Sequence, residues 1–190
     1  MWDLLIASCA VDGAPPAVVA QIIRVESAGD PFAIHVNADD FSREDGETVE
    51  AVVARATALG YSVDLGLMQI NSRHLDTSGL SVDDAMEPCA NIRLGSDIFM
   101  RGYRPALAFY GDTPLARKAA LSAYNTGTFH RGFANGYVGR YADGLAAAPS
   151  AVSAVDSDPH QSDTRIDVTF GEGRSSSQVS DGDQRGGSGR

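Results

Sequence analysis

One glutamate, Glu26, closes the apolar stretch "QIIRVESAGDP" and has the surroundings that acid catalysis uses. Val19, Ile23 and Glu26 fall at i, i+4 and i+7, so the carboxyl shares a helical stripe with aliphatic side chains. The negative end of the helix dipole and the aliphatic neighbours both disfavour its charged form. A carboxylic acid that stays protonated can donate to a leaving-group oxygen. A surface glutamate at a helix end would give the same local pattern.

A second motif, "GLMQIN", has residue types suited to binding a sugar. Gly66 allows a close backbone approach to a ligand, Met68 offers a soft apolar surface, and Gln69 supplies a donor and an acceptor. These properties fit an amphipathic sugar with acetamido groups. A core turn filled by methionine is the alternative interpretation.

A third motif, "LSAYNTG", ends a segment rich in small residues, which can pack closely against a neighbouring element. Tyr124 and Asn125 would then lie at one edge of a groove, where a hydroxyl and an amide could orient the acid or the substrate. A half-buried core tyrosine is the alternative for Tyr124.

Helices are the elements expected to position these residues. Pro15 and Pro16 suit a first helical turn, and Gly29 with Pro31 ends the helix that carries Glu26. Further helices are expected over 46–60, from Pro88 through Tyr103, from Pro114 to Asn125 and after "NGYVGRY", and residues 61–71 could form a small β element.

The length and composition indicate one soluble domain. A chain of 190 residues can bury one sizeable core, which we place in residues 1–147. Residues 148–190 are rich in Ser, Gly and Asp, and we expect a disordered tail that is dispensable for chemistry. The net charge of −10 argues against a nucleic-acid partner, and no apolar run is long enough for a membrane span.

Taken together and in this order, the three motifs resemble those of the lysozyme-like lytic transglycosylases that cleave peptidoglycan. The stretches "ESAGDPFAIHVN", "VDLGLMQINSRHL" and "LSAYNTGTFHRGFANGYVGR" are similar to the transglycosylases of type IV secretion and conjugation systems. The resemblance covers most of residues 9–141. It implies a mainly α, α+β lysozyme-like domain with a saccharide cleft.

The resemblance also implies roles for individual residues. Glu26 would be the sole catalytic acid and base, with no metal or organic cofactor. His35 departs from the serine common near this position, and an acidic insertion spans roughly 36–63; the secretion branch shares both departures. The substrate-binding positions implied are Ser27, His35, Gly66, Met68, Gln69, Tyr124 and Asn125.

In the mechanism that the resemblance implies, Glu26 protonates the β-1,4 linkage after an N-acetylmuramic acid, whose own 6-hydroxyl then closes a 1,6-anhydro ring. This reaction would open the cell wall locally for a type IV secretion apparatus. Two alternatives stay open: a lysozyme-type hydrolase with Asp64 as second carboxylate, and a non-catalytic peptidoglycan-binding scaffold of the apparatus. A simple turn-capping role is an equal interpretation of Asp64.

The two cysteines, Cys9 and Cys89, could by themselves be a disulfide or two buried thiols. Because the family acts in the periplasm, where thiols oxidise, the resemblance implies a disulfide. No export signal is evident: the start "MWDLLIASCA" lacks a basic region, although "IASC" has some likeness to a lipidation box.

Overall fold

A computed structural model describes residues 2–141, which form a mainly helical fold with one small sheet, as the sequence predicts. The expected tail, the boundary near residue 147 and a helix after "NGYVGRY" all lie outside the described residues; that stretch itself ends in a 3-10 turn. Within residues 2–141, no helix is long and apolar enough to cross a membrane. The helices are α1 (Asp3–Cys9), α2 (Pro16–Ser27), α3 (Val49–Ala58), α4 (Leu75–Ser78), α5 (Val82–Met86), α6 (Pro88–Tyr110), α7 (Pro114–Thr126) and α8 (Arg131–Ala134), with 3-10 turns η1 (Ser72–His74) and η2 (Val138–Tyr141).

The sheet has three short antiparallel strands in the order β1 (Ile34–Val36), β2 (Val63–Leu65) and β3 (Ile70–Asn71). The β element expected near residues 61–71 is therefore present as β2 and β3. The strand β1 was not predicted from sequence, because three residues are too few to show the alternation that identifies a strand.

The helix α2 runs through the core and carries the motif glutamate at its last turn. Val19, Ile22 and Ile23 on its inner face are at most 1% exposed. Pro16 occupies its first turn, and Ala28 ends it in the left-handed conformation with φ 54°. The burial of these aliphatic side chains on one face fixes the position of α2, and with it the position of Glu26.

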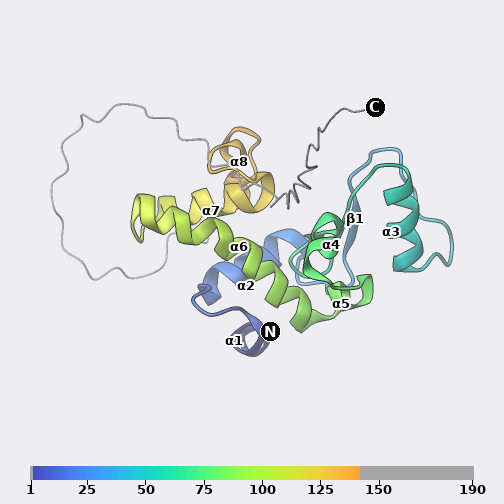
Figure 1. Ribbon diagram of the computed structural model, residues 1–190, viewed down its shortest axis with the longest axis horizontal. Helices are drawn as coiled ribbons and strands as arrows, with labels where there is room; N and C mark the ends of the chain where they lie inside the picture. The colour runs from blue at the N-terminus through green and yellow to red at the C-terminus, as the bar shows by residue number, and fades with distance from the viewer. Residues whose placement is uncertain (1, 142–190) are drawn as a thin grey trace, which may run out of the picture.

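The longest helices, α6 and α7, pack against each other as an antiparallel pair (Figure 1). A Cβ atom on Gly102 would lie 3.0 Å from the Cβ of Ala123, so the glycine permits this close approach. The helix α6 continues beyond the predicted end at Tyr103 and passes through Pro105. Its buried face continues with Ala106, and this packing outweighs the one backbone hydrogen bond that proline removes.

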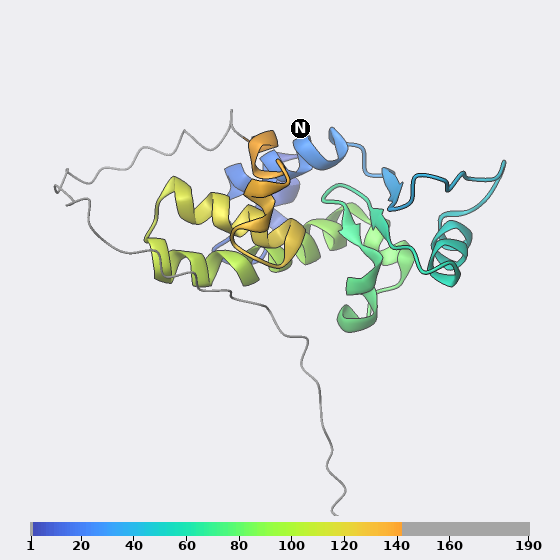
Figure 2. The same cartoon turned by 90° about the horizontal axis from the view of Figure 1, so that it is seen from above.

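The acidic insertion forms α3 and the loop before it, at the opposite end of the molecule from the α6–α7 connection (Figures 1 and 2). Arg55 closes this loop by donating to both carboxylate oxygens of Glu47, at 2.8 and 2.7 Å, and its guanidinium lies over the Phe41 ring. The Arg55 hydrogen bonds lower the pKa of Glu47 to about 2. The insertion is thus an ordered unit with its own contacts.

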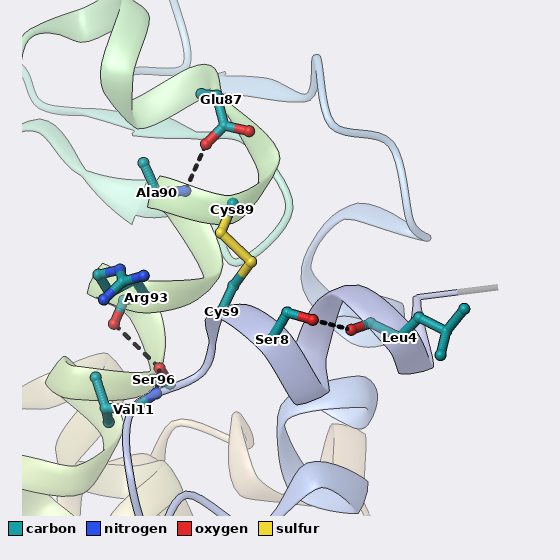
Figure 3. The surroundings of a disulfide bond; sticks show 9 residues. All are labelled: Leu4, Ser8, Cys9, Val11, Glu87, Cys89, Ala90, Arg93 and Ser96. Carbon is teal, nitrogen blue, oxygen red and sulfur yellow. Dashed lines mark hydrogen bonds between the residues drawn. A yellow bond between two sulfur atoms is a disulfide. The ribbon is translucent and has the colours of Figure 1, made fainter.

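The first helix, α1, is bonded to the start of α6 by the Cys9–Cys89 disulfide, which has a Cα–Cα distance of 5.3 Å (Figure 3). The bond implied by the family resemblance is therefore present, and a Cys9 sulfur bonded in this way is not a lipidation site. The indole of Trp2 reaches the turn after α2, because a Cβ on Gly29 would lie 3.1 Å from its Nε1. The helix α1 thus contacts the end of the helix that carries the motif glutamate.

Replacing both cysteines by alanine should lower the free energy of unfolding by about 2–4 kcal/mol, the usual value for a disulfide that closes a long loop. The bond joins residues 80 apart, so its loss enlarges the conformational freedom of the unfolded chain. Urea unfolding with and without a reductant measures this effect. The reductant should destabilise the parent protein and leave the Cys9→Ala/Cys89→Ala variant unchanged; equal stabilities under oxidising conditions would contradict the prediction.

Candidate active site

Glu26 lies at the C-terminal end of α2 with its side chain 12% exposed, so most of the carboxyl is enclosed by protein. Two tyrosine hydroxyls reach the same carboxyl oxygen: Tyr137 Oη donates to Oε1 at 2.6 Å and Tyr141 Oη donates at 2.5 Å. The two hydroxyls are also 2.7 Å from each other. Burial raises the pKa of both tyrosines above the usual value, which keeps them protonated as donors.

The two tyrosine hydroxyls can bind the Glu26 carboxyl in either of its protonation states. Tyr137 and Tyr141 carry one hydroxyl proton each, and when both donate to Oε1 the other carboxyl oxygen, Oε2, is left to carry or release a proton. When Glu26 loses its proton, both hydroxyls can still donate to Oε1. The arrangement suits a carboxyl that gives up a proton and later takes one back.

Arg140 is the cation nearest this carboxyl among the ion pairs of residues 2–141. Its Nη2 lies 3.8 Å from Glu26 Oε2 and donates to the Val25 carbonyl at 3.0 Å. Its guanidinium also lies over the Tyr137 ring, 5.3 Å from the centroid. The backbone and ring contacts therefore fix the guanidinium beside Oε2.

The turn containing Gly66 and Met68 is tied to both helices that flank it. Ser27 Oγ at the end of α2 donates to the Leu67 carbonyl at 2.8 Å. Tyr124 Oη on α7 donates to the Met68 carbonyl at 2.6 Å. Burial first, and then the neighbouring Glu26 charge, raise the pKa of Tyr124, so its hydroxyl stays a donor. Ser27 and Tyr124, both predicted from sequence, thus bind the turn as well as bordering the site.

A buried amide, Asn91 on α6, holds the same turn from beneath. It is fully buried, accepts from the Met68 backbone N–H at 2.8 Å, and donates to the carbonyls of Leu65 at 2.9 Å and Ala85 at 2.6 Å. Sequence reasoning missed Asn91, because an asparagine inside an amphipathic helix has the same local pattern whether its amide is buried or solvated.

Two sequence expectations for the turn need correction. Met68 is 0% exposed and packs against Gly95, where a Cβ would lie 2.6 Å from its sulfur, so its side chain belongs to the core and offers no surface to a sugar. Gly66 is buried too, with φ 69°. A Cβ there would lie 2.5 Å from Asn91 Nδ2, so the glycine permits a close approach of Asn91 rather than of a ligand.

Gln69 keeps only part of the hydrogen-bonding capacity expected of it. Its Nε2 donates to the carbonyls of Gly66 at 2.9 Å and Ala33 at 3.2 Å, and its backbone has φ 49°. Both amide protons are thus used within the protein, and the side-chain carbonyl is what Gln69 can offer to a ligand.

The sheet places His35, Asp64 and Asn71 in one cross-strand row. Asp64 Oδ1 accepts from Asn71 Nδ2 at 2.7 Å, and Oδ2 accepts from Asn37 Nδ2 at 3.0 Å. His35 is exposed beside this pair. Asp64 is therefore held by side-chain amides from both neighbouring segments, and not by the backbone of a turn. The described residues hold no group of three or more His, Cys, Asp or Glu side chains with metal-site geometry.

Asn125, the last predicted site residue, is exposed at the end of α7, where its Oδ1 accepts from Asn135 Nδ2 at 3.2 Å. Sequence reasoning missed Tyr137, Arg140 and Tyr141 as site residues. Their spacing of i, i+3 and i+4 in "YVGRY" was the available signal, because it places three polar groups on one face of a helical turn.

The sequence of this chain is similar to those of known proteins. The family model "Transglycosylase SLT domain" matches residues 4–145. Protein VirB1 of Agrobacterium fabrum is 38% identical over 126 residues, covering 65% of this chain and 51% of that protein. The type IV secretion system protein VirB1 of Brucella abortus is 34% identical over 121 residues, covering 62% and 51%. The chain thus spans about half the length of these relatives. No solved structure matches it.

Proposed function

Because the chain belongs to the transglycosylase SLT domain family, we propose that it is a peptidoglycan lytic transglycosylase with Glu26 as its catalytic acid and base. The observation that carries the proposal is the enclosed Glu26 carboxyl with two protonated tyrosine hydroxyls on one oxygen. The two hydroxyls can hydrogen-bond this carboxyl both when it acts as an acid and when, after losing its proton, it acts as a base. The bond cleaved is the β-1,4 linkage between N-acetylmuramic acid and N-acetylglucosamine.

In the first half of the reaction, protonated Glu26 donates its proton to the oxygen of the scissile linkage as the bond to the sugar breaks. The acetamido oxygen of the N-acetylmuramic acid stabilises the positive charge that develops at the sugar carbon, as in substrate-assisted glycosidases. In the second half, ionised Glu26 removes the proton from the 6-hydroxyl of the same sugar. The hydroxyl oxygen attacks and closes a 1,6-anhydro ring, with the proximity advantage of an intramolecular step.

Asp64 gives a specific reason to weigh hydrolysis as the second candidate. Its carboxylate is oriented by Asn37 and Asn71, and a carboxylate so fixed could position an attacking water. The two reactions leave different ends on the product: the anhydro product is one water lighter than the hydrolysed one.

We expect Asp64→Asn to keep most of the cleavage rate, because the 6-hydroxyl needs no second carboxylate. Removing a general base that positions water would instead cost about 10²–10⁴-fold. Mass spectrometry of the products, together with the cleavage rate of the variant, separates the two. Hydrated products from the parent protein, combined with an inactive Asp64→Asn variant, would make this protein a hydrolase of lysozyme type.

The cellular setting that we propose is the periplasm, with local opening of the cell wall for a type IV secretion apparatus. Two observations support it: the relatives named type IV secretion system protein VirB1, and the Cys9–Cys89 disulfide, which persists in an oxidising compartment. Deleting the coding sequence in a secreting strain and restoring it with either the parent or the Glu26→Gln form tests this setting. Secretion restored equally by both forms would contradict a wall-opening role.

A further inference from the structure

A depression lies at the junction of α7 and α8, where polar side chains border a surface that is itself more apolar than polar. Its position is set by the end of α7, where Gly127 reverses the chain with φ 72° so that α8 folds back beside it. Its cationic residue, Arg131, has no part in the proposed reaction. The lining residues are Asn125, Thr126, Arg131, Ala134 and Asn135.

The side-chain oxygens of Asn125 and Asn135 both accept hydrogen bonds from within the protein. The backbone N–H of Tyr137 donates to Asn135 Oδ1 at 3.0 Å, which fixes which end of that amide is oxygen. Asn135 Nδ2 therefore faces Asn125 and donates to its Oδ1 at 3.2 Å. The group that Asn125 still offers to the depression is its Nδ2, a donor.

Arg131 adds a positive charge that no carboxylate neutralises within residues 2–141. Its Nη2 donates to the Thr126 carbonyl at 2.8 Å and its Nε to Thr128 Oγ1 at 3.3 Å, both neutral acceptors. The ion pairs of the described residues do not include it. Its remaining N–H groups are donors too.

Two residues of the depression are linked to residues of the candidate active site. Asn125 directly follows Tyr124, whose hydroxyl binds the Met68 carbonyl. Asn135 binds the backbone of Tyr137, whose hydroxyl reaches Glu26. The positions of Asn125 and Asn135 are therefore set by the same segments that carry Tyr124 and Tyr137.

We propose that this depression binds a carboxylate of the peptidoglycan strand, through the guanidinium of Arg131 and the amide Nδ2 of Asn125. The proposal rests on the proposed function for the identity of the polymer. The free N–H groups of Arg131 and Asn125 are hydrogen-bond donors, and Arg131 is positively charged, so the site fits an anionic group that accepts hydrogen bonds. The planar guanidinium matches the geometry of a carboxylate. Two sources of that carboxylate exist on the strand: the acidic residues of the stem peptide, and the lactyl group once the stem has been removed.

Equilibrium binding is measured in the full-length Glu26→Gln protein, so that turnover does not interfere, with and without Arg131→Gln. The probes are peptidoglycan strands with stems, the same strands after amidase removal of the stems, and a neutral N-acetylglucosamine oligomer. We expect Arg131→Gln to raise the Kd for a carboxylate-bearing strand about three- to tenfold, the range for one partly exposed charge-assisted bond. Arg131→Lys should recover much of this loss, and the neutral oligomer should bind all forms equally.

A loss confined to strands with stems assigns the stem carboxylate, and a loss that also occurs on amidase-treated strands assigns the lactyl group. Equal Kd values for the Arg131→Gln and parent forms on both strands would overturn the proposal, provided that thermal unfolding shows both folded. Cleavage is assayed separately with Glu26 intact. Strands that bind in an Arg131-dependent manner but are never cleaved would refute the proposed function and leave this inference standing.

Discussion

Glu26→Gln should reduce glycan cleavage by about 10⁴-fold, the upper end of what general acid–base catalysis contributes, because one group serves both halves of the reaction. Glutamine keeps the shape of the side chain and leaves an oxygen for the hydroxyls of Tyr137 and Tyr141, but it has no proton to give. The rate of release of soluble fragments from peptidoglycan measures the loss.

The control for this variant is the same chemical change at Glu44, an exposed residue of the insertion, which should leave the rate unchanged. Thermal unfolding of Glu26→Gln should match the parent protein or improve slightly, because a carboxyl enclosed by protein becomes a neutral amide. A folded Glu26→Gln protein with full activity would remove Glu26 from the chemistry and the proposed reaction with it.

Asn91→Ala should lower the free energy of unfolding by about 3–5 kcal/mol, more than the loss of the disulfide. The change strips three buried backbone groups of their partner at once: the Met68 N–H and the carbonyls of Leu65 and Ala85. Each buried group left unpaired costs about 1–3 kcal/mol, and a cavity adds to the loss. Water that enters the cavity would recover part of it.

Urea unfolding measures the Asn91→Ala effect, and Arg93→Ala provides the matched control. Arg93 lies two residues further along α6 on the exposed face, so its replacement by alanine should change stability by less than about 0.5 kcal/mol. A loss below about 1 kcal/mol in Asn91→Ala would mean that the turn under Ser27 and Tyr124 holds its shape without the amide.

The sequence predicted those features that depend on neighbours along the chain. Thr113 caps α7 and Pro114 begins it, because a cap and a first-turn proline act within four residues. Glu26 was identified for the same reason, from its stripe and its helix end. The two-strand element at residues 63–71 also depends on a local turn.

What the sequence left open depends on contacts between distant segments. Tyr141 reaches Glu26 across 115 residues, and Asn91 reaches Met68 across 23. Met68 was expected at a sugar-binding surface because methionine offers a soft apolar side chain, with a core turn filled by methionine as the alternative. The packing of Gly95 against its sulfur shows that the alternative is correct. A motif identifies which residues contribute to a site, but burial determines whether the side chain or only the backbone of such a residue can contact a ligand.

The disulfide between α1 and α6 also determines how the protein carries mechanical tension. A pull applied along the chain before Cys9 passes through the sulfur–sulfur bond to Cys89 and onward through α6. The covalent path therefore bypasses residues 10–88, which include Glu26, the sheet and the acidic insertion. Stretching the molecule between its first helix and Tyr141 should therefore unfold α6 and α7, while residues 10–88 carry no tension along their backbone for as long as the bond is intact. Reducing the bond would put the glutamate helix directly under load.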